Sequence, residues 1–303
     1  MKKVLITGVK GFLGRNIASH FSRSGYETYG IGHGNISPEE CETIGLKFWL
    51  EAEITVDTLK ALNQKFDLIF HCAGSGSVGF SIENPYEDFK KTVDGTLEVL
   101  EYLRLYNPDA QLIYPSSPAV QGEHPDAPIK EEYVGKPASP YGYHKKIAED
   151  LCRSYSEKYA LSVKIIRLFS VYGNGLQKQL LWDAYQKLTL PREQVEFWGT
   201  GTETRDFIHI SDVLSLIDII IAQKEHFMII NGASGIKHTV AEVITLIRNN
   251  LLPACSISFN NQVNIGNPIY YWADMTHLNR LNWKPKISFE EGVQNYIDWA
   301  KNL

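Results

Sequence analysis

The sequence lacks an excess of positive charge. Its 303 residues include 30 Lys and Arg against 35 Asp and Glu, which leaves a formal net charge of −5. Proteins that bind nucleic acid need a basic surface to pair with the phosphates. The charge balance therefore argues against a nucleic-acid partner.

Closely spaced cysteines and long apolar runs are also missing. The four cysteines are far apart in the chain, at Cys41, Cys72, Cys152 and Cys255. Disulfide frameworks and metal sites depend on characteristic spacings, so we expect neither, and a reducing cytoplasm is the expected compartment. The apolar stretch before Gly8 is one strand long, and the run 214–222 is interrupted by Asp218. We therefore expect no signal peptide and no membrane span.

What is present is an alternation of short apolar runs with longer amphipathic ones. This pattern predicts an α/β fold with a parallel sheet and helices on both faces. We expect strands near 3–7, 27–31, 46–50, 67–71, 111–116 and 163–168. Helices are expected near 12–24, 56–64, 86–106, 140–159, 178–189, 211–223, 239–249 and 288–301. The hydrophobic content of 44% can bury the core of one or two domains.

A glycine turn follows the first expected strand. Gly8, Gly11 and Gly14 stand between the apolar run 4–6 and an amphipathic helix. Glycines in this position let backbone amides and the helix N-terminus approach a pyrophosphate closely. A glycine triplet alone is a weak signal, but this context favours a dinucleotide site.

Tyr141 and Lys145 lie four residues apart at an expected helix start. This spacing puts both side chains on one helical face. An ammonium group one turn away favours the phenolate, so we expect the pKa of Tyr141 to fall below its usual ~10 by roughly 1–3. Such a tyrosine can carry protons at neutral pH. The alternative is a solvated helix face, where this spacing is common.

Ser117 follows the apolar run 112–114 and precedes Pro118. A hydroxyl at a strand end can point into a cleft, where it would hydrogen-bond a substrate oxygen beside the tyrosine and polarise a carbonyl. The alternative is an ordinary turn serine.

Five further motifs accompany the glycine turn, the Tyr/Lys pair and the serine. They are His71–Gly74, Pro85 with Thr92–Thr96, Arg167–Gly173, Gly201–His209 and Tyr271–Asp274. With these motifs the chain resembles an extended short-chain dehydrogenase/reductase, of the NAD-dependent epimerase/dehydratase family that modifies nucleotide-activated sugars. The resemblance covers nearly the whole length. Within the family it is strongest to sugar 4-epimerases and 4-ketoreductases.

The resemblance implies roles for individual residues. Tyr141 maps onto the proton donor, Lys145 onto the helper that also hydrogen-bonds the nicotinamide ribose, and Ser117 onto the catalytic hydroxyl. The implied cofactor contacts are Gly8, Lys10, Gly11, Phe12, Leu13, Gly14, His33, Glu53, Ala73, Tyr141 and Lys145. Glu53 stands where the family usually places an acidic adenine contact. No residue is expected to bind a metal.

The resemblance also implies a division into domains. A Rossmann-type, doubly wound parallel sheet would form the dinucleotide-binding domain from residues 1–168 plus 206–232. A smaller α/β substrate domain would then comprise residues 169–205 plus 233–303.

Cofactor choice depends on the end of the second strand. An NAD site usually places Asp or Glu there to bind the ribose hydroxyls. Gly32 stands at this position, and its neighbours are not acidic. Without a carboxylate to repel a 2′-phosphate, and with Lys10 and His33 able to approach it, we expect NADP(H) rather than NAD(H). Lys10 is equally well explained as a solvated turn residue.

The residues after Ser117 restrict the chemistry. Sugar dehydratases and uronate decarboxylases of this family place an acid one or two positions further on, where this chain has Pro118 and Ala119. What remains is hydride transfer at one secondary carbon, C4 of a nucleotide-activated hexose or deoxyhexose. The missing carboxylate favours a 4-ketoreductase, whereas Tyr271–Asp274 favours a 4-epimerase with tightly held NAD. A non-catalytic NADP-binding sensor or scaffold is a third hypothesis.

The resemblance also implies substrate contacts, at Ser117, Ser170, Lys178, Trp198, Arg205 and Tyr271. The guanidinium of Arg205 can bind a diphosphate through two hydrogen bonds, and the alternative is a structural ion pair with Asp206. Ser170 stands where the family has asparagine, and Asn264 where it has a diphosphate-binding arginine. These departures indicate a weaker grip on diphosphate or a different activated substrate. Relatives associate through the helices near 86–106 and 140–159, so a homodimer is expected.

Overall fold

The computed structural model describes residues 1–262, 266 and 268–303. The chain forms two compact units, each made of three segments. Unit 1 comprises Met1–Val120, Ser139–Arg167 and Leu216–Ile230, and unit 2 comprises Gln121–Ala138, Leu168–Ser215 and Asn231–Leu303. Relative to the expected domains, residues 121–138, 168, 206–215 and 231–232 fall in unit 2 rather than in unit 1. The functional division into cofactor and substrate domains stays a prediction.

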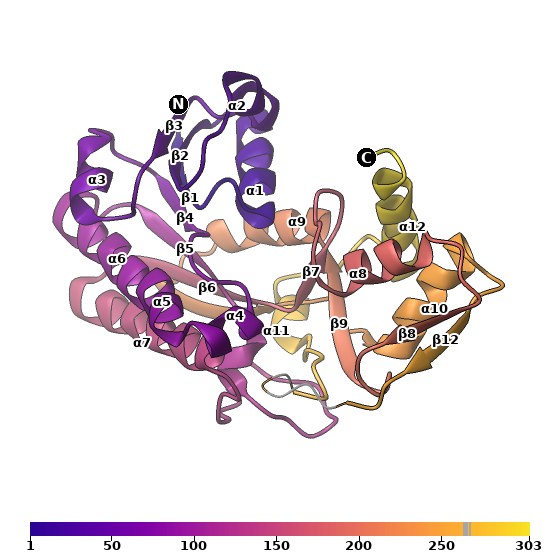
Figure 1. Cartoon of the computed structure of the whole chain (residues 1–303). Helices are drawn as coiled ribbons and strands as arrows, with labels where there is room; N and C mark the ends of the chain where they lie inside the picture. Colours follow the sequence, from indigo (N-terminus) through magenta and orange to yellow (C-terminus); the bar gives the residue numbers. More distant parts are fainter. Residues whose placement is uncertain (263–265, 267) are drawn as a thin grey trace. The chain divides into compact units, whose positions relative to one another are not determined.

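A seven-stranded sheet organises unit 1, with the strand order β10-β6-β5-β4-β1-β2-β3 (Figure 1). The strands are β1 (Lys3–Thr7), β2 (Glu27–Gly32), β3 (Phe48–Glu51), β4 (Leu68–His71), β5 (Gln111–Ser116), β6 (Ser162–Leu168) and β10 (Phe227–Gly232). Neighbouring strands from β3 to β6 pair in parallel. The expected α/β fold class with a doubly wound parallel sheet is confirmed.

Helices cover both faces of this sheet. In Figure 1, α6 and α7 run along one face, and α1 and α9 lie on the other. The helices of unit 1 and the segment leading into it are α1 (Phe12–Arg23), α2 (Pro38–Ile44), α3 (Val56–Ala61), α4 (Val78–Glu83), α5 (Pro85–Phe89), α6 (Gly95–Tyr106), α7 (Pro140–Tyr159) and α9 (Ile210–Ile221). A π-helical turn, η1 (Lys90–Asp94), joins α5 to α6. The helix expected over 86–106 is therefore interrupted.

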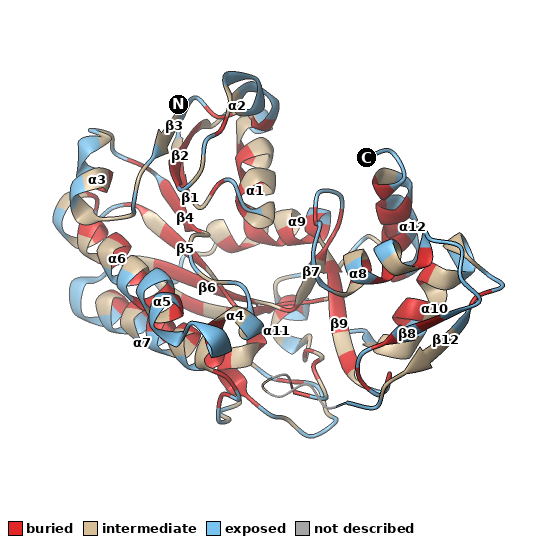
Figure 2. Cartoon of the chain, in the orientation of Figure 1, coloured by how far each residue is buried: buried red, intermediate tan, exposed pale blue. Residues whose placement is uncertain are grey.

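The strands are buried because both faces are covered. Every residue of β4 is buried, and β1 and β6 are buried except at their ends (Figure 2). Leu103, Leu112, Ala148, Cys152 and Val163 belong to one core cluster between the sheet and the pair α6 and α7. This explains why the strands read as continuous apolar runs rather than as alternating ones.

Unit 2 contains two small sheets. One has the order β11-β9-β7 and the other pairs β12 with β8. Their strands are β7 (Ser170–Tyr172), β8 (Gln194–Phe197), β9 (Thr204–His209), β11 (Lys237–Thr239) and β12 (Ser256–Phe259). The helices are α8 (Gln179–Leu188), α10 (Val240–Leu251), α11 (Thr276–Arg280) and α12 (Phe289–Ala300).

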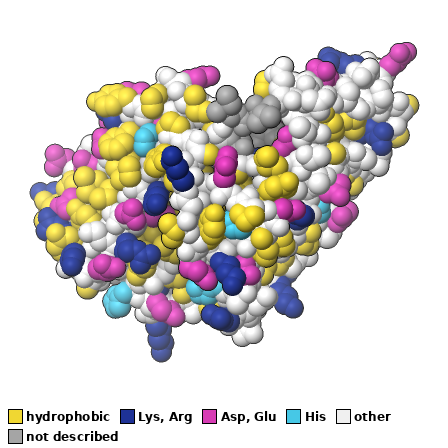
Figure 3. Space-filling view, turned by 90° about the horizontal axis from the view of Figure 1, so that it is seen from below, with side chains coloured by type: hydrophobic (Ala, Val, Ile, Leu, Met, Phe, Trp, Pro, Cys, Tyr) yellow, Lys and Arg dark blue, Asp and Glu magenta, His cyan; other side chains and the backbone are white. Residues whose placement is uncertain are grey.

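The described residues include charged side chains, cysteines and possible metal ligands. Acidic and basic side chains are intermixed on the face shown in Figure 3. All four cysteines are free thiols. Over residues 1–262, 266 and 268–303, no group of three or more potential metal ligands is found, and no helix is both long and apolar enough to cross a membrane.

Candidate active site

The turn between β1 and α1 is shaped by two close backbone approaches. Gly8 has a φ of +67°, and a Cβ atom there would lie 2.7 Å from the Ala73 nitrogen. A Cβ on Gly14 would lie 2.6 Å from the Gly8 carbonyl oxygen. Gly11 differs, because its added Cβ would meet only that same oxygen, at 3.2 Å. Gly8 and Gly14 are thus required for packing, whereas Gly11 is exposed and leaves room for a ligand.

The N-terminus of α1 has free amides. Gly11 precedes the helix, and no side chain among the described residues caps it. By contrast, the Ser139 side chain accepts a hydrogen bond from the Gly142 nitrogen at the start of α7. The amides of Phe12 and Leu13 therefore lie at an uncapped helix start, which carries partial positive charge. This arrangement fits the pyrophosphate of a dinucleotide cofactor.

A carboxylate that the sequence pattern did not indicate lies beside the loop after β2. In the sheet Gly32 pairs with Glu51, the last residue of β3. The Glu51 carboxylate accepts a hydrogen bond from the Gly34 nitrogen at 3.2 Å. The ammonium of Lys10 donates to the Asn35 carbonyl oxygen at 3.0 Å. A carboxylate therefore reaches the loop from the neighbouring strand, even though β2 itself ends without one.

Two other predicted cofactor residues, His33 and Glu53, are exposed in unit 1 near the ends of β2 and β3. Ala73 follows β4, and its nitrogen donates to the Thr7 hydroxyl at 3.1 Å. That hydroxyl also lies 2.8 Å from Nδ1 of His71. Burial lowers the pKa of His71 to about 3, so its ring is neutral and supports the β1 and β4 ends without an acid/base role.

Tyr141 and Ser117 meet in unit 1, as predicted. Tyr141 lies in the first turn of α7, and the Ser117 hydroxyl is close enough to its phenol to lower the pKa of the phenol. Ser117 follows β5, and its oxygen also accepts a bond from the Ala119 nitrogen at 3.2 Å. The pKa of Tyr141 is raised to about 12, mainly by burial; the nearby Ser117 hydroxyl lowers it, and the negative charge of Asp88 raises it. The expected lowering of the Tyr141 pKa is therefore wrong for the protein by itself.

Lys145 does not offset this effect of burial, because its ammonium is bound elsewhere. Its Nζ donates to the Tyr114 hydroxyl at 3.2 Å and to the Pro115 carbonyl oxygen at 3.0 Å. Nζ also lies 4.6 Å from the centre of the Tyr114 ring. Burial lowers the pKa of Lys145 to about 8. Lys145 is thus one turn from Tyr141 on α7, but its ammonium is hydrogen-bonded to residues of β5.

Arg205 and Tyr271 come together in unit 2. The Arg205 guanidinium lies 5.7 Å from the centre of the Tyr271 ring and donates to the Thr204 carbonyl oxygen at 2.7 Å. The proposed alternative, an ion pair with Asp206, is wrong. The buried Asp206 carboxylate instead accepts hydrogen bonds from Ser234, Gly235 and Ala273.

The other predicted substrate residues in unit 2 are more scattered. Ser170 begins β7, where it pairs with Phe207 of β9. Lys178 is exposed at the start of α8, and Trp198 follows β8 with 54% of its surface exposed. Asn264 lies outside the described residues.

Known proteins resemble this chain over its whole length. The family model described as the NAD dependent epimerase/dehydratase family matches residues 4–231. The UDP-glucuronate 4-epimerase of Thermodesulfobacterium geofontis is 25% identical over 315 residues, which cover 98% of this chain and 95% of that protein. The CDP-paratose 2-epimerase of Salmonella typhi is 27% identical over 341 residues, with 99% and 100% covered.

A solved structure shares the fold. The UDP-glucuronic acid 4-epimerase from Bacillus cereus, in complex with UDP-glucuronic acid and NAD, matches with a TM-score of 0.87 and 24% identity. The match covers 99% of both chains. Because the family model spans most of the chain, including the glycine turn, Ser117, Tyr141 and Lys145, this protein belongs to the NAD-dependent epimerase/dehydratase family of enzymes.

Proposed function

We propose that the protein transfers hydride at C4 of a nucleotide-activated hexose, between the secondary alcohol and the ketone. The observation that carries the proposal is the proximity of Tyr141 and Ser117, with Lys145 one turn further along α7. This cluster and the glycine turn belong to the same unit. The bound nicotinamide would supply or accept the hydride.

The protein's own residues would handle the proton. With its pKa raised, Tyr141 is a neutral phenol at pH 7 and can donate to the oxygen of a 4-ketosugar. Ser117, oriented by the Ala119 amide, would hydrogen-bond the same oxygen and polarise the carbonyl. In the reverse direction the phenolate would take the proton of the 4-hydroxyl, favoured by the positive charge of Lys145. Pro118 and Ala119 offer no group for proton exchange at C5 or C6.

We infer a 4-epimerase that retains NAD, and a ketoreductase is the second candidate. The epimerase is supported by Glu51, which brings a carboxylate to the loop after β2, and by the NAD bound in the Bacillus cereus 4-epimerase. This inference reverses the preference for NADP and a 4-ketoreductase that the missing β2 carboxylate suggested. Gly32 and the nearby Lys10 still favour the second candidate, because neither repels a 2′-phosphate.

Exchange of Glu51 for Gln is expected to shift the ratio of NADP to NAD affinity by about tenfold in favour of NADP, since one negative charge near the 2′-position is removed. The measurement is calorimetric titration with each dinucleotide. Glu53→Gln is the matched control, because an adenine contact changes both affinities equally and leaves the ratio unchanged. A ratio unaffected by Glu51→Gln would remove the basis for choosing NAD.

The reaction is tested with UDP-glucuronic acid and UDP-glucose as probes. The purified protein is first extracted with acid to find bound NAD, and each probe is then followed by proton NMR without added cofactor. The expected result is bound NAD and a product inverted at C4. Turnover of a 4-ketosugar only when NADPH is added would support the ketoreductase instead. Inversion at C2, as the name of the Salmonella relative describes, would contradict the C4 assignment.

Activity is expected to fall as the pH rises through about 8. Lys145 is charged below its lowered pKa of about 8 and loses its proton above it, and the positive charge that favours the phenolate is lost with it. Two groups beside it stay neutral across this range, because burial lowers the pKa of His71 to about 3 and raises that of Cys72 to about 12. The measurement is kcat/KM between about pH 6 and about pH 10, which reports the free enzyme. Cys72→Ser should leave the alkaline limb in place; a limb that moved would assign it to the thiol.

Three expectations remain predictions. They are the cytoplasmic location, the homodimer formed through α5 to α7, and the substrate role of unit 2. The non-catalytic sensor hypothesis is weakened because the chain belongs to an enzyme family and retains Ser117, Tyr141 and Lys145.

A further inference from the structure

A buried carboxylate lies beside the proposed catalytic residues without a part in the mechanism above. Asp88 of α5 has no exposed surface. Its Oδ2 accepts a hydrogen bond from Nδ1 of His144 at 2.5 Å. Its other oxygen, Oδ1, is also buried and accepts no hydrogen bond from any described residue. A buried carboxylate with a single partner is costly unless that partner is retained.

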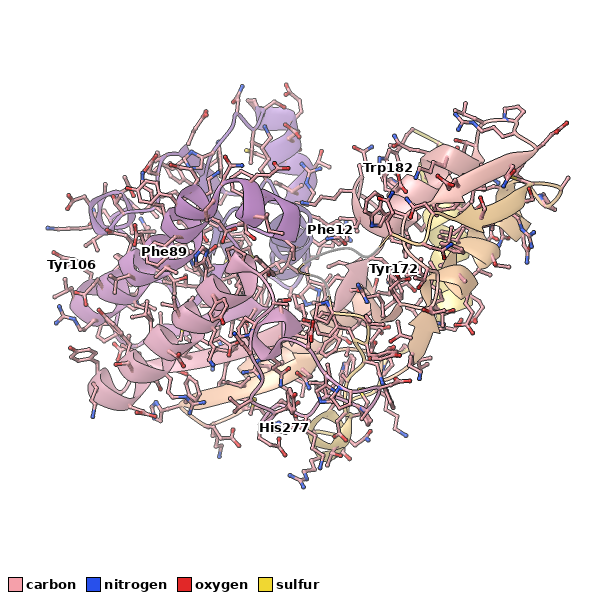
Figure 4. All side chains as sticks on the ribbon, turned by 60° about the horizontal axis from the view of Figure 1, so that its bottom comes forward. Phe12, Phe89, Tyr106, Tyr172, Trp182 and His277 are labelled. Atoms are coloured by element: carbon pink, nitrogen blue, oxygen red, sulfur yellow. The ribbon has the colours of Figure 1, made fainter. Side chains whose placement is uncertain are left out.

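His144 belongs to the part of α7 that carries the proposed catalytic groups. It stands three residues after Tyr141 and immediately before Lys145. Its side chain is 13% exposed, and the ring of Phe89, labelled in Figure 4, meets it edge-on with the ring centres 5.4 Å apart. Asp88 and Phe89 are neighbours on α5, so this short helix contacts the imidazole through two side chains.

A second bond fixes the same turn of α7. The hydroxyl of Ser81, a fully buried residue of α4, accepts a hydrogen bond from the Tyr141 backbone nitrogen at 3.0 Å. The α4–α5 segment therefore holds α7 at two points, the Tyr141 backbone and the His144 ring. Both hydrogen bonds position the Tyr141 phenol, because the Tyr141 backbone and the next turn of the helix cannot move independently.

The charge of Asp88 reaches both proposed catalytic groups. Besides burial, the Asp88 charge raises the pKa of Tyr141, whereas Ser117 lowers it. The Asp88 charge also opposes the lowering of the Lys145 pKa, as does the charge of Glu149. Asp88 therefore favours the protonated form of the acid and of its helper.

We propose that Asp88 and His144 form a positioning pair for Tyr141, which fixes the first turn of α7 and keeps one negative charge beside the phenol. The pair acts through the hydrogen bond and through the charge, and these two contributions can be separated by substitution. This inference rests on the proposed function of Tyr141.

Three variants separate the two contributions. Asp88→Asn retains an oxygen that can accept the His144 bond but removes the charge. His144→Asn retains a nitrogen donor near the position of Nδ1 and removes the imidazole. His144→Ala removes the donor and leaves the buried carboxylate without a partner. Thermal unfolding of each variant shows whether the fold is intact.

The kinetic experiment uses whichever of UDP-glucuronic acid and UDP-glucose the wild type converts. His144→Ala is expected to lose about tenfold or more in kcat with KM changed little, because the reacting group is displaced while substrate contacts stay. His144→Asn should recover most of that loss. Asp88→Asn should shift the alkaline limb of the pH profile, which is assigned to Lys145 above, downward by roughly 0.5–1 pH unit, because the negative charge that stabilises the ammonium is removed. If the Asp88–His144 pair had only a structural role, the variants would lose thermal stability and the pH profile of activity would not move.

A measurement without turnover distinguishes failure of the pair from failure of the proposed reaction. Ionisation of Tyr141 is followed by tyrosinate absorbance in the NAD-loaded protein, as the difference between each protein and the same protein carrying Tyr141→Phe. At alkaline pH, Asp88→Asn should give a larger difference signal than wild type. An unchanged signal together with full kcat in His144→Ala would overturn the positioning pair, whereas a changed signal in a protein that converts neither probe would overturn only the proposed reaction.

Discussion

Tyr141→Phe is expected to lower kcat by about 100-fold to about 10,000-fold, which is the range that a positioned general acid contributes. The substitution removes only the hydroxyl beside Ser117 and leaves the ring in place. NAD affinity should stay within about twofold of wild type, because the variant keeps the Tyr141 ring and all the other implied cofactor contacts. Turnover of a UDP-hexose and calorimetric titration with NAD measure the two quantities separately.

Tyr143 provides the matched control for this result. It lies two residues further along α7, and 42% of its surface is exposed. Tyr143→Phe removes the same atom from the same helix and should leave both kcat and NAD affinity unchanged. If Tyr141→Phe retained more than about a tenth of the wild-type rate, another group would have to carry the proton, and the proposed role of Tyr141 would be wrong.

Gly11→Val is expected to lose NAD binding, whereas Gly14→Val is expected to lose stability. At Gly11 the backbone is extended and the added Cβ meets only the Gly8 carbonyl oxygen, at 3.2 Å. The valine should therefore fold but occupy the space beside the uncapped helix start, weakening NAD binding by about 100-fold or more. At Gly14 the Cβ would lie 2.6 Å from backbone, so the variant should lose roughly 1–3 kcal/mol or more in the free energy of unfolding.

Thermal unfolding and NAD titration of both variants test this contrast. The Gly11 variant should keep its Tm within about 2 °C of wild type, whereas the Gly14 variant should unfold several degrees lower. Gly79→Ala is the control for adding a Cβ elsewhere in unit 1, because its nearest neighbour would be the Ser77 hydroxyl at 3.9 Å. Equal losses of stability in the two valine variants would show that Gly11 is also needed for packing.

Most long elements were predictable from the sequence because their periodicity is strong. The helix expected over 140–159 is α7, and the strand expected over 3–7 is β1. The short helix α2 was missed, although Ser37 and Glu40 form a capping box at its start. The capping box is visible in the sequence, but seven residues are too few for an apolar periodicity that indicates a helix.

The proximity of Tyr141 and Ser117 was predictable, whereas the electrostatics around them were not. Tyr141 and Ser117 meet as the motifs indicated. The direction of the Tyr141 pKa was wrong, because sequence spacing shows a neighbouring lysine but shows neither the burial of the phenol nor the bonds that draw Lys145 to β5. The proximity of Glu51 to the loop after β2 was not predictable for a related reason, because only the pairing of β2 with β3 brings Glu51 beside Gly32.

The order of segments in unit 1 has a consequence for synthesis on the ribosome. β10 is the edge neighbour of β6, yet it begins 227 − 168 = 59 residues after β6 ends. At about 5–20 residues per second, β6 would wait roughly 3–12 s for its neighbour. During that interval the nascent chain presents an unpaired parallel edge, which is a template for pairing with other chains. Slow translation between these strands should therefore favour aggregation over a soluble product, and binding of a chaperone to the nascent chain should counter it.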